Sequence, residues 1–338
     1  MSPSSHAQAP SPAIVFDTLQ AYQRSVALRG AIDLDLFTAI GEGNKSIRAI
    51  AARIKASEKG TRVLCDFLTI IGFLLKQDGE YALTPDSAAF LNRHSPAYMG
   101  TLANFLMNPK IAGMLEDLAG VIRHGGALPS DDGALEPENP IWVEFARSMA
   151  PLMRMPADQI AKIFAGDSQP IKVLDISAGH GLYGIAFAQQ NPNARIVGLD
   201  WANVLEVANE NARKAGVADR YSTIPGSAFE VDLGSGYDVV LIPNFLHHFD
   251  PATNEKVLRK VHAALKPAGV AVTAEFIPNE DRISPPRDAM FSMQMLGTPS
   301  GDAYTYSELE KMFRNAGFTR NEMRELAPFP QRLVISYK

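Results

Sequence analysis

The stretch that decides the fold is residues 172–184, KVLDISAGHGLYG. Its first part, Lys172 to Ser177, is a short apolar run that predicts a buried strand, and glycines follow at positions 179, 181 and 184. Glycines between a strand and a helix let a ligand approach the backbone and the amino end of that helix. The stretch therefore predicts a nucleoside cofactor site, although its Gly-x-Gly-x-x-Gly spacing also matches dinucleotide cofactors.

Strand and helix patterns alternate after this turn, which predicts a parallel sheet of βα units. We expect further strands at 195–200, 221–225, 238–243 and 270–276, helices at 204–215, 251–265 and 305–315, and a final antiparallel hairpin of 322–326 and 332–337. Asp250 before Pro251, and the pair Thr305 and Glu308, are typical helix-start signals. The predicted fold class is α/β, a Rossmann-like sheet with a C-terminal antiparallel hairpin.

The first half of the chain is predicted to be helical from Ile14 to about Ile163. Ser46 and Ser57 can cap two successive helices, and Asp78-Gly79 between short apolar runs predicts a hairpin. Two helices and a hairpin make a winged-helix-like unit, which could bind DNA or serve dimerisation and substrate shaping. The net charge of −5 favours the second role, because nucleic-acid binding needs a basic excess.

Composition limits the class of protein further. Hydrophobic residues make up 46% and charged residues 20%, an ordinary globular mix. The longest apolar run, 67–75, is too short for a membrane helix, and the first residues lack a secretory pattern, so we expect a cytoplasmic protein. Cys65 alone excludes an internal disulfide or a multi-cysteine zinc site, and we expect no metal. We expect a disordered tail at 1–12, a helical domain at 13–165 and a cofactor domain at 166–338.

Two acids indicate which cofactor the site takes. Asp200 ends the second strand, nineteen residues after Gly181, where a carboxylate can accept hydrogen bonds from ribose hydroxyls. Asp175 precedes the glycines, and its charge would repel a pyrophosphate but attract the amino group of S-adenosylmethionine (SAM). These acids favour SAM over NAD.

The segment from Asp175 to Gly181 resembles the first motif of class I SAM-dependent methyltransferases, with Ser177 in place of the usual glycine. Nearly the whole chain resembles their small-molecule O-methyltransferases, which include plant phenylpropanoid, hydroxyindole and bacterial polyketide enzymes. The resemblance implies a homodimer formed through the helical domain, a helix at 138–155 that covers the cofactor and the acceptor, and a turn at 265–269. The expected cofactor-binding residues are Asp175, Ser177, Gly179, Gly181, Asp200, Trp201, Ser227, Ala228, Phe229 and Asn244.

The resemblance also assigns the catalytic residues. His247 follows the fourth strand in the position of the family's general base, and His248 replaces the Asp that usually comes next. Imidazole titrates near neutrality and can take a hydroxyl proton. Glu275, after the fifth strand, matches the glutamate that orients this histidine. The second supporting acid falls on Ala303 by register, with Asp302 one residue away, which leaves open an enzyme that works mostly by proximity.

Methionines indicate the acceptor pocket, because thioethers pack well against planar rings. The expected acceptor-binding residues are Met149, Met153, Met290, Met293 and Tyr304. We therefore predict methyl transfer from SAM to a hydroxyl of an aromatic or polyketide-like small molecule. The alternatives are N- or C-methylation on the same scaffold, and a winged-helix regulator that binds SAM without turnover. His180, inside the glycine loop, is expected to face solvent.

Overall fold

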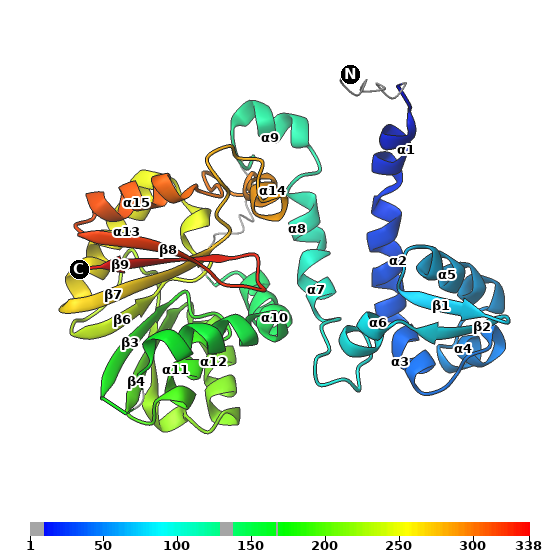
Figure 1. Cartoon of the computed structure of the whole chain (residues 1–338), viewed down its shortest axis with the longest axis horizontal. Helices are drawn as coiled ribbons and strands as arrows, with labels where there is room; N and C mark the ends of the chain where they lie inside the picture. Colours follow the sequence, from blue (N-terminus) through cyan, green and yellow to red (C-terminus); the bar gives the residue numbers. More distant parts are fainter. Residues whose placement is uncertain (1–9, 129–137, 167) are drawn as a thin grey trace, which may run out of the picture. The chain divides into compact units, whose positions relative to one another are not determined.

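The computed structural model describes residues 10–128, 138–166 and 168–338. Residues 1–9 of the expected tail lie outside the described residues, as does Asp167 in the expected domain boundary. The chain divides into two compact units, 1–103 and 104–338 (Figure 1). Among the described residues, no helix combines the length and apolar content that a membrane span requires.

The first unit is helical with one small hairpin. Its elements are α1 (Ala13–Gln20), α2 (Tyr22–Asp33), α3 (Leu36–Gly41), α4 (Ile47–Arg53), α5 (Glu58–Ile70), β1 (Leu74–Gln77), β2 (Glu80–Leu83) and α6 (Pro85–Phe90). Ser46 and Ser57 cap α4 and α5 by accepting backbone N–H groups. Asp78 and Gly79 both have positive φ, 51° and 81°, as a tight hairpin turn requires. The winged-helix-like arrangement expected from the sequence is confirmed.

The next helices are α7 (Leu102–Leu106), which contains the boundary between the units, α8 (Pro109–Gly113), α9 (Leu118–His124) and the long α10 (Pro140–Phe164). The last of these packs against α11 (Leu182–Gln190) and α12 (Ala202–Lys214), which follow strands of the sheet. The boundary between the two compact units therefore falls between residues 103 and 104. The change from helices alone to alternating strands and helices comes later, at residues 166–170.

A seven-stranded sheet forms the centre of the second unit, in the order β5-β4-β3-β6-β7-β9-β8. Its strands are β3 (Ile171–Ile176), β4 (Ala194–Asp200), β5 (Tyr221–Pro225), β6 (Tyr237–Leu241), β7 (Leu265–Glu275), β8 (Arg320–Glu325) and β9 (Arg332–Tyr337). Strands β3 to β7 run parallel, and β8 and β9 form the expected antiparallel hairpin at one edge. The expected Rossmann-like sheet is confirmed.

The expected turn at 265–269 is wrong, because these residues already belong to β7. Leu265 pairs with Tyr237, and after a register shift Val270 pairs with Val239. A Cβ at Gly269 would lie 2.9 Å from the Tyr237 carbonyl oxygen. The two backbones therefore approach closely at this irregularity.

Helices cover both faces of the sheet. α10, α11 (Leu182–Gln190) and α12 (Ala202–Lys214) lie on one side, and α13 (Pro251–Ala264) and α15 (Tyr306–Asn315) on the other (Figure 1). Thr305 and Glu308 form the expected capping box at α15. Because β3 to β7 are parallel, the segments that follow them meet at the carboxyl ends of the strands, where open α/β folds bind ligands.

Candidate active site

The glycine loop after β3 adopts an unusual backbone. Ser177, Gly179 and Gly181 all have positive φ, at 55°, 57° and 74°. A Cβ at Gly181 would lie 2.9 Å from the Cβ of Ala208 and 3.0 Å from the hydroxyl of Tyr221. Gly181 is therefore required for packing of the loop, whereas Ser177 and Gly179 line a cavity.

Asp200 holds this loop and faces the cavity. Its Oδ2 accepts the N–H of Gly179 at 2.8 Å, and its Oδ1 accepts the N–H of Trp201 at 2.7 Å. Burial raises the pKa of Asp200 to about 6, against the two backbone donors, which lower it. Each carboxylate oxygen can accept a further hydrogen bond from a ligand.

Asp175 is fully buried below the loop. Its Oδ2 accepts the N–H of Gly184 at 2.9 Å, and its Oδ1 has no hydrogen-bond partner within the described part of the chain. Burial raises the pKa of Asp175 to about 8, and the charge of Asp200 adds to this effect. Among the described residues Asp175 is not part of the cavity wall, so the structure places it behind the loop.

His180 is also buried, and the expectation that it faces solvent is wrong. Its Nδ1 accepts the N–H of Leu182 at 3.1 Å, and its carbonyl accepts the side-chain amide of Asn211 at 2.8 Å. Burial lowers the pKa of His180 to about 4. The side chain thus closes the first turn of α11.

The cavity beside Asp200 encloses about 390 Å³. The structure brings together at its wall these expected residues: Ser177, Gly179, Asp200, Trp201, Ser227, Ala228, Phe229 and Asn244. Sequence reasoning missed others that line it: Leu199, Val204, Glu230, Phe245 and Phe249. A carboxylate, aromatic side chains and a glycine backbone in one cavity fit the ribose and adenine of SAM.

His247 and Glu275 meet where β6 and β7 end. The ring Nδ1 of His247 lies 2.5 Å from Oε2 of Glu275, and both side chains are buried. Oε1 of Glu275 accepts the backbone N–H groups of Phe245 and Leu246, each at 2.9 Å. One carboxylate thus orients the imidazole and anchors the short helix η2 (Leu246–His248), leaving Nε2 of His247 as the atom that can meet a ligand.

Asp302 does not support this ring. Its Oδ2 contacts Arg282 at 3.2 Å and its Oδ1 accepts the N–H of Ala303 at 2.8 Å. The backbone N–H of Asp302 donates to the carbonyl of His247 at 3.0 Å. In the described structure Glu275 is therefore the acid that contacts the His247 ring.

A second cavity of about 450 Å³ lies against His247. Its walls include the expected Met149 and Met153 of α10 and Met290 of α14 (Pro286–Met295). Two cavities, the one beside Asp200 and this one, share four side chains: Trp142, Phe145, Asn244 and His248. A ligand in one cavity would therefore face a ligand in the other across these residues.

Two expected acceptor residues do not line this cavity among the described side chains. Tyr304 is buried and its hydroxyl donates to the carbonyl of Phe249 at 2.6 Å, while Met293 lies partly exposed on another face of α14. The cavity is also lined by Met295, which belongs to the same methionine cluster, and by residues that sequence reasoning missed, among them Arg287, Phe291, Gln294 and Thr298. These residues repeat with a helical period from position 287, and that spacing could have revealed the face.

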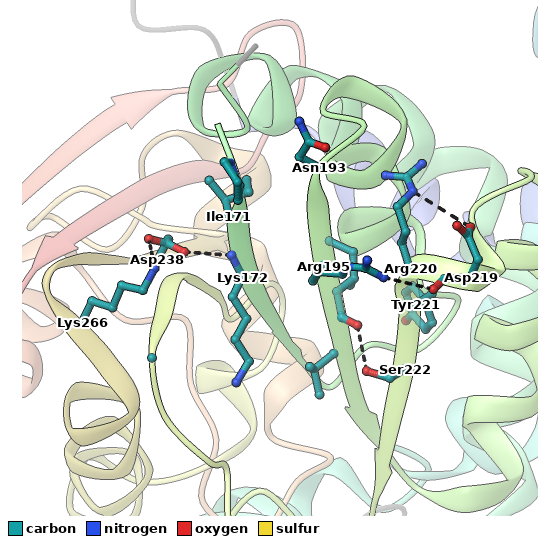
Figure 2. A pocket seen from close by; sticks show the side chains of 14 residues that line it. Ile171, Lys172, Asn193, Arg195, Asp219, Arg220, Tyr221, Ser222, Asp238 and Lys266 are labelled. Carbon is teal, nitrogen blue, oxygen red and sulfur yellow. Dashed lines mark hydrogen bonds and ion pairs between the residues drawn. The ribbon is translucent and has the colours of Figure 1, made fainter. Parts of the chain in front are cut away.

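A third cavity, of about 530 Å³, lies at the amino ends of the parallel strands, where β3 to β6 begin (Figure 2). Cations line it, but they contact protein oxygens. Lys266 pairs with Asp238 at 2.6 Å, Lys172 donates to the carbonyl of Ser235, and Arg220 donates to two main-chain carbonyls. We assign no ligand to this cavity.

Comparison with known proteins identifies the family. Residues 134–319 match the model of the O-methyltransferase domain, and residues 16–93 match that of the O-methyltransferase dimerisation domain. A candidate O-methyltransferase from Nostoc punctiforme PCC 73102 has a solved structure that is 52% identical, with a TM-score of 0.94 over 98% of this chain and 100% of that one.

More distant relatives agree with this assignment. The 3-hydroxy-5-methyl-1-naphthoate 3-O-methyltransferase of Streptomyces sahachiroi is 26% identical over 90% of this chain and 89% of its own length. Human N-acetylserotonin methyltransferase, solved with SAM, is 18% identical and shows the same fold, with a TM-score of 0.83 over 99% of both chains. This chain belongs to the SAM-dependent O-methyltransferase family.

Proposed function

We propose that this protein transfers the methyl group of SAM to a hydroxyl of an aromatic or polyketide-like small molecule. One observation carries the proposal: a cavity with a carboxylate and aromatic walls adjoins a largely apolar cavity lined by His247, whose ring contacts Glu275. The Streptomyces relative named for a hydroxynaphthoate supports an aromatic acceptor.

The cofactor is proposed to occupy the cavity beside Asp200. Asp200 would accept hydrogen bonds from the ribose, and Trp201 and Phe229 would flank the adenine. When bound, SAM supplies an electrophilic methyl group on a positively charged sulfur. Asp175 would act from behind the loop by holding the backbone N–H of Gly184. Because burial raises its pKa to about 8, the expected attraction between its charge and the SAM amino group is not supported.

The acceptor is proposed to lie against Met149, Met153 and Met290 in the second cavity. Thioether side chains adapt to flat rings. His247 would take the hydroxyl proton on Nε2 as the oxygen attacks the methyl carbon, and the carbon–sulfur bond would break to leave S-adenosylhomocysteine. Glu275 would stabilise the imidazolium that results.

The assembly is proposed to be a homodimer formed through the first helices. Ile14, Phe16, Leu19, Tyr22 and Val26 of α1 and α2 are each more than half exposed, and such a patch is typical of an interface. The match of residues 16–93 to a dimerisation domain supports this assignment. We assign dimerisation and substrate shaping to residues 13–165, and SAM binding to residues 166–338.

The experiment is an acceptor panel with methyl-labelled SAM. Hydroxyaromatic, aminoaromatic and carbon-acid compounds are offered to the purified chain, and the products are identified by mass and by the chemical shift of the transferred methyl. We expect labelled methoxy products from hydroxyaromatics. Products labelled only on nitrogen or carbon, or SAM binding by calorimetry without any product, would overturn the proposal.

A further inference from the structure

We infer that His248 binds a second oxygen of the acceptor, next to the hydroxyl that is methylated. The inference rests on the proposed function, because it takes the acceptor to occupy the cavity that contains His247. It assigns His248 a positioning role and narrows the acceptors to aromatic hydroxyls with a neighbouring hydroxyl or carbonyl oxygen.

The position of His248 carries the first step. Its side chain lines both adjoining cavities. Its ring centre lies 4.3 Å from that of His247. The rings of His248 and Trp142 pack in a T-shaped arrangement, with centres 5.5 Å apart and an interplanar angle of 82°. A ligand that places a hydroxyl at His247 therefore brings its adjacent ring position to His248.

The hydrogen bonding of His248 carries the second step. Nδ1 is buried and has no partner within the part of the chain that the structure describes. Burial and the neighbouring His247 hold the pKa of His248 well below its usual range, so the imidazole is neutral. A buried N–H group without a hydrogen-bond partner costs more free energy than a buried nitrogen lone pair without one. The favoured tautomer therefore has bare Nδ1 and the proton on Nε2.

This tautomer makes the two histidines complementary. Nδ1 of His247 faces Glu275, so its Nε2 is free to accept a proton. Nε2 of His248 carries a proton and can donate it to an oxygen. The pair thus matches an acceptor that presents one hydroxyl and, beside it, one oxygen with a lone pair. A monohydroxylated ring leaves the donor of His248 unpaired.

The test compares two matched ligands, 2,3-dihydroxynaphthalene and 2-naphthol, which differ by one hydroxyl beside the other. Affinity is measured by calorimetry on the full chain saturated with S-adenosylhomocysteine, and kcat/KM is measured with SAM. We expect the wild type to favour the diol about fivefold to tenfold in affinity, the ratio that one desolvated hydrogen bond gives.

Three variants separate hydrogen bonding from shape. His248→Phe keeps a ring against Trp142 but has no donor, so the preference should fall to about twofold, which is the statistical advantage of two hydroxyls. His248→Gln places an amide N–H near the position of Nε2 and should keep the preference. His248→Asn places its amide near the position of Nδ1 and should lose it.

The possible results are distinct. A wild-type preference of twofold or less, or an unchanged preference in His248→Phe, overturns the inference. If the diol binds preferentially in the wild type and not in His248→Phe, but neither compound is methylated, the inference holds and the proposed hydroxyl methylation fails for this class. A folded chain, checked by circular dichroism, is required of each variant.

Discussion

The two oxygens of Glu275 serve two different partners: Oε2 lies 2.5 Å from Nδ1 of His247, and Oε1 accepts the N–H groups of Phe245 and Leu246. Two consecutive donors fix which oxygen faces the backbone. The remaining oxygen must then accept from the ring, which selects the tautomer with a free Nε2. Glu275 therefore controls the protonation pattern of His247 as well as its orientation.

The first prediction concerns this pair. His247→Ala should lower turnover on a hydroxyl acceptor by roughly 10²–10⁴ and leave SAM affinity within a few-fold, because the ring faces the acceptor. Glu275→Gln should cost nearly as much. Its carbonyl would replace Oε1, and its amide N–H would face Nδ1 of His247, which forces the proton onto Nε2.

Turnover and calorimetric SAM affinity are measured for both variants, with Glu206→Gln on the exposed face of α12 as the matched control. Activity within tenfold of wild type in both variants would mean that the reaction relies on proximity.

The second prediction concerns cofactor binding. Asp200→Ala should weaken SAM binding by roughly 1.5–3 kcal/mol, because it removes hydrogen bonds to a charged acceptor. Asp219→Ala is the control, since Asp219 precedes β5 at the amino ends of the parallel strands and its side chain is 77% exposed. Calorimetry with equal losses in the two variants would reject Asp200 as a ribose ligand.

The third prediction concerns assembly. We expect a homodimer in sedimentation at micromolar concentration. Phe16→Glu and Leu19→Glu should shift it toward monomer, because each places a charge in an apolar contact. Met323→Glu, on β8 in the other compact unit, should leave the sedimentation coefficient unchanged. A wild-type monomer contradicts the proposal.

The fourth prediction concerns pH. The pKa of Asp175 is about 8 in the folded protein and near 3.8 in the unfolded chain. Between these values the folded state keeps a proton that the unfolded chain has released. The contribution of Asp175 to the free energy of unfolding is therefore largest at low pH and falls as pH rises toward 8. Asp175→Asn removes this titration.

The free energy of unfolding of the SAM-free protein is measured in urea at pH 5 and pH 8. From pH 5 to pH 8 the free energy of unfolding of the wild type should fall by on the order of 3 kcal/mol more than that of the variant. Asp200, with a pKa near 6, leaves a smaller slope of the same sign in both proteins. Parallel pH profiles would show that Asp175 does not carry this proton.

Local signals in the sequence were sufficient for most of the fold. The caps Ser46 and Ser57, the Asp78-Gly79 turn and the Thr305–Glu308 box act through neighbouring backbone groups, so they can be recognised without tertiary context. The resemblance to the O-methyltransferases implied that His247 and Glu275 meet, and the parallel pairing of β6 with β7 brings them together.

The cavity walls were decided only by tertiary packing. Met293 and Met295 are two positions apart on one helix, yet only Met295 lines the acceptor cavity among the described residues. Tyr304 turns into the core, and the strand ladder extends β7 back to Leu265. The sequence by itself determined the α/β class and the glycine loop, since those depend on local chemistry and strand order, and its resemblance to the family implied the His247–Glu275 pairing. The tertiary structure decided which side chains face the ligands, because that depends on the rotation of each packed helix and on long-range strand pairing.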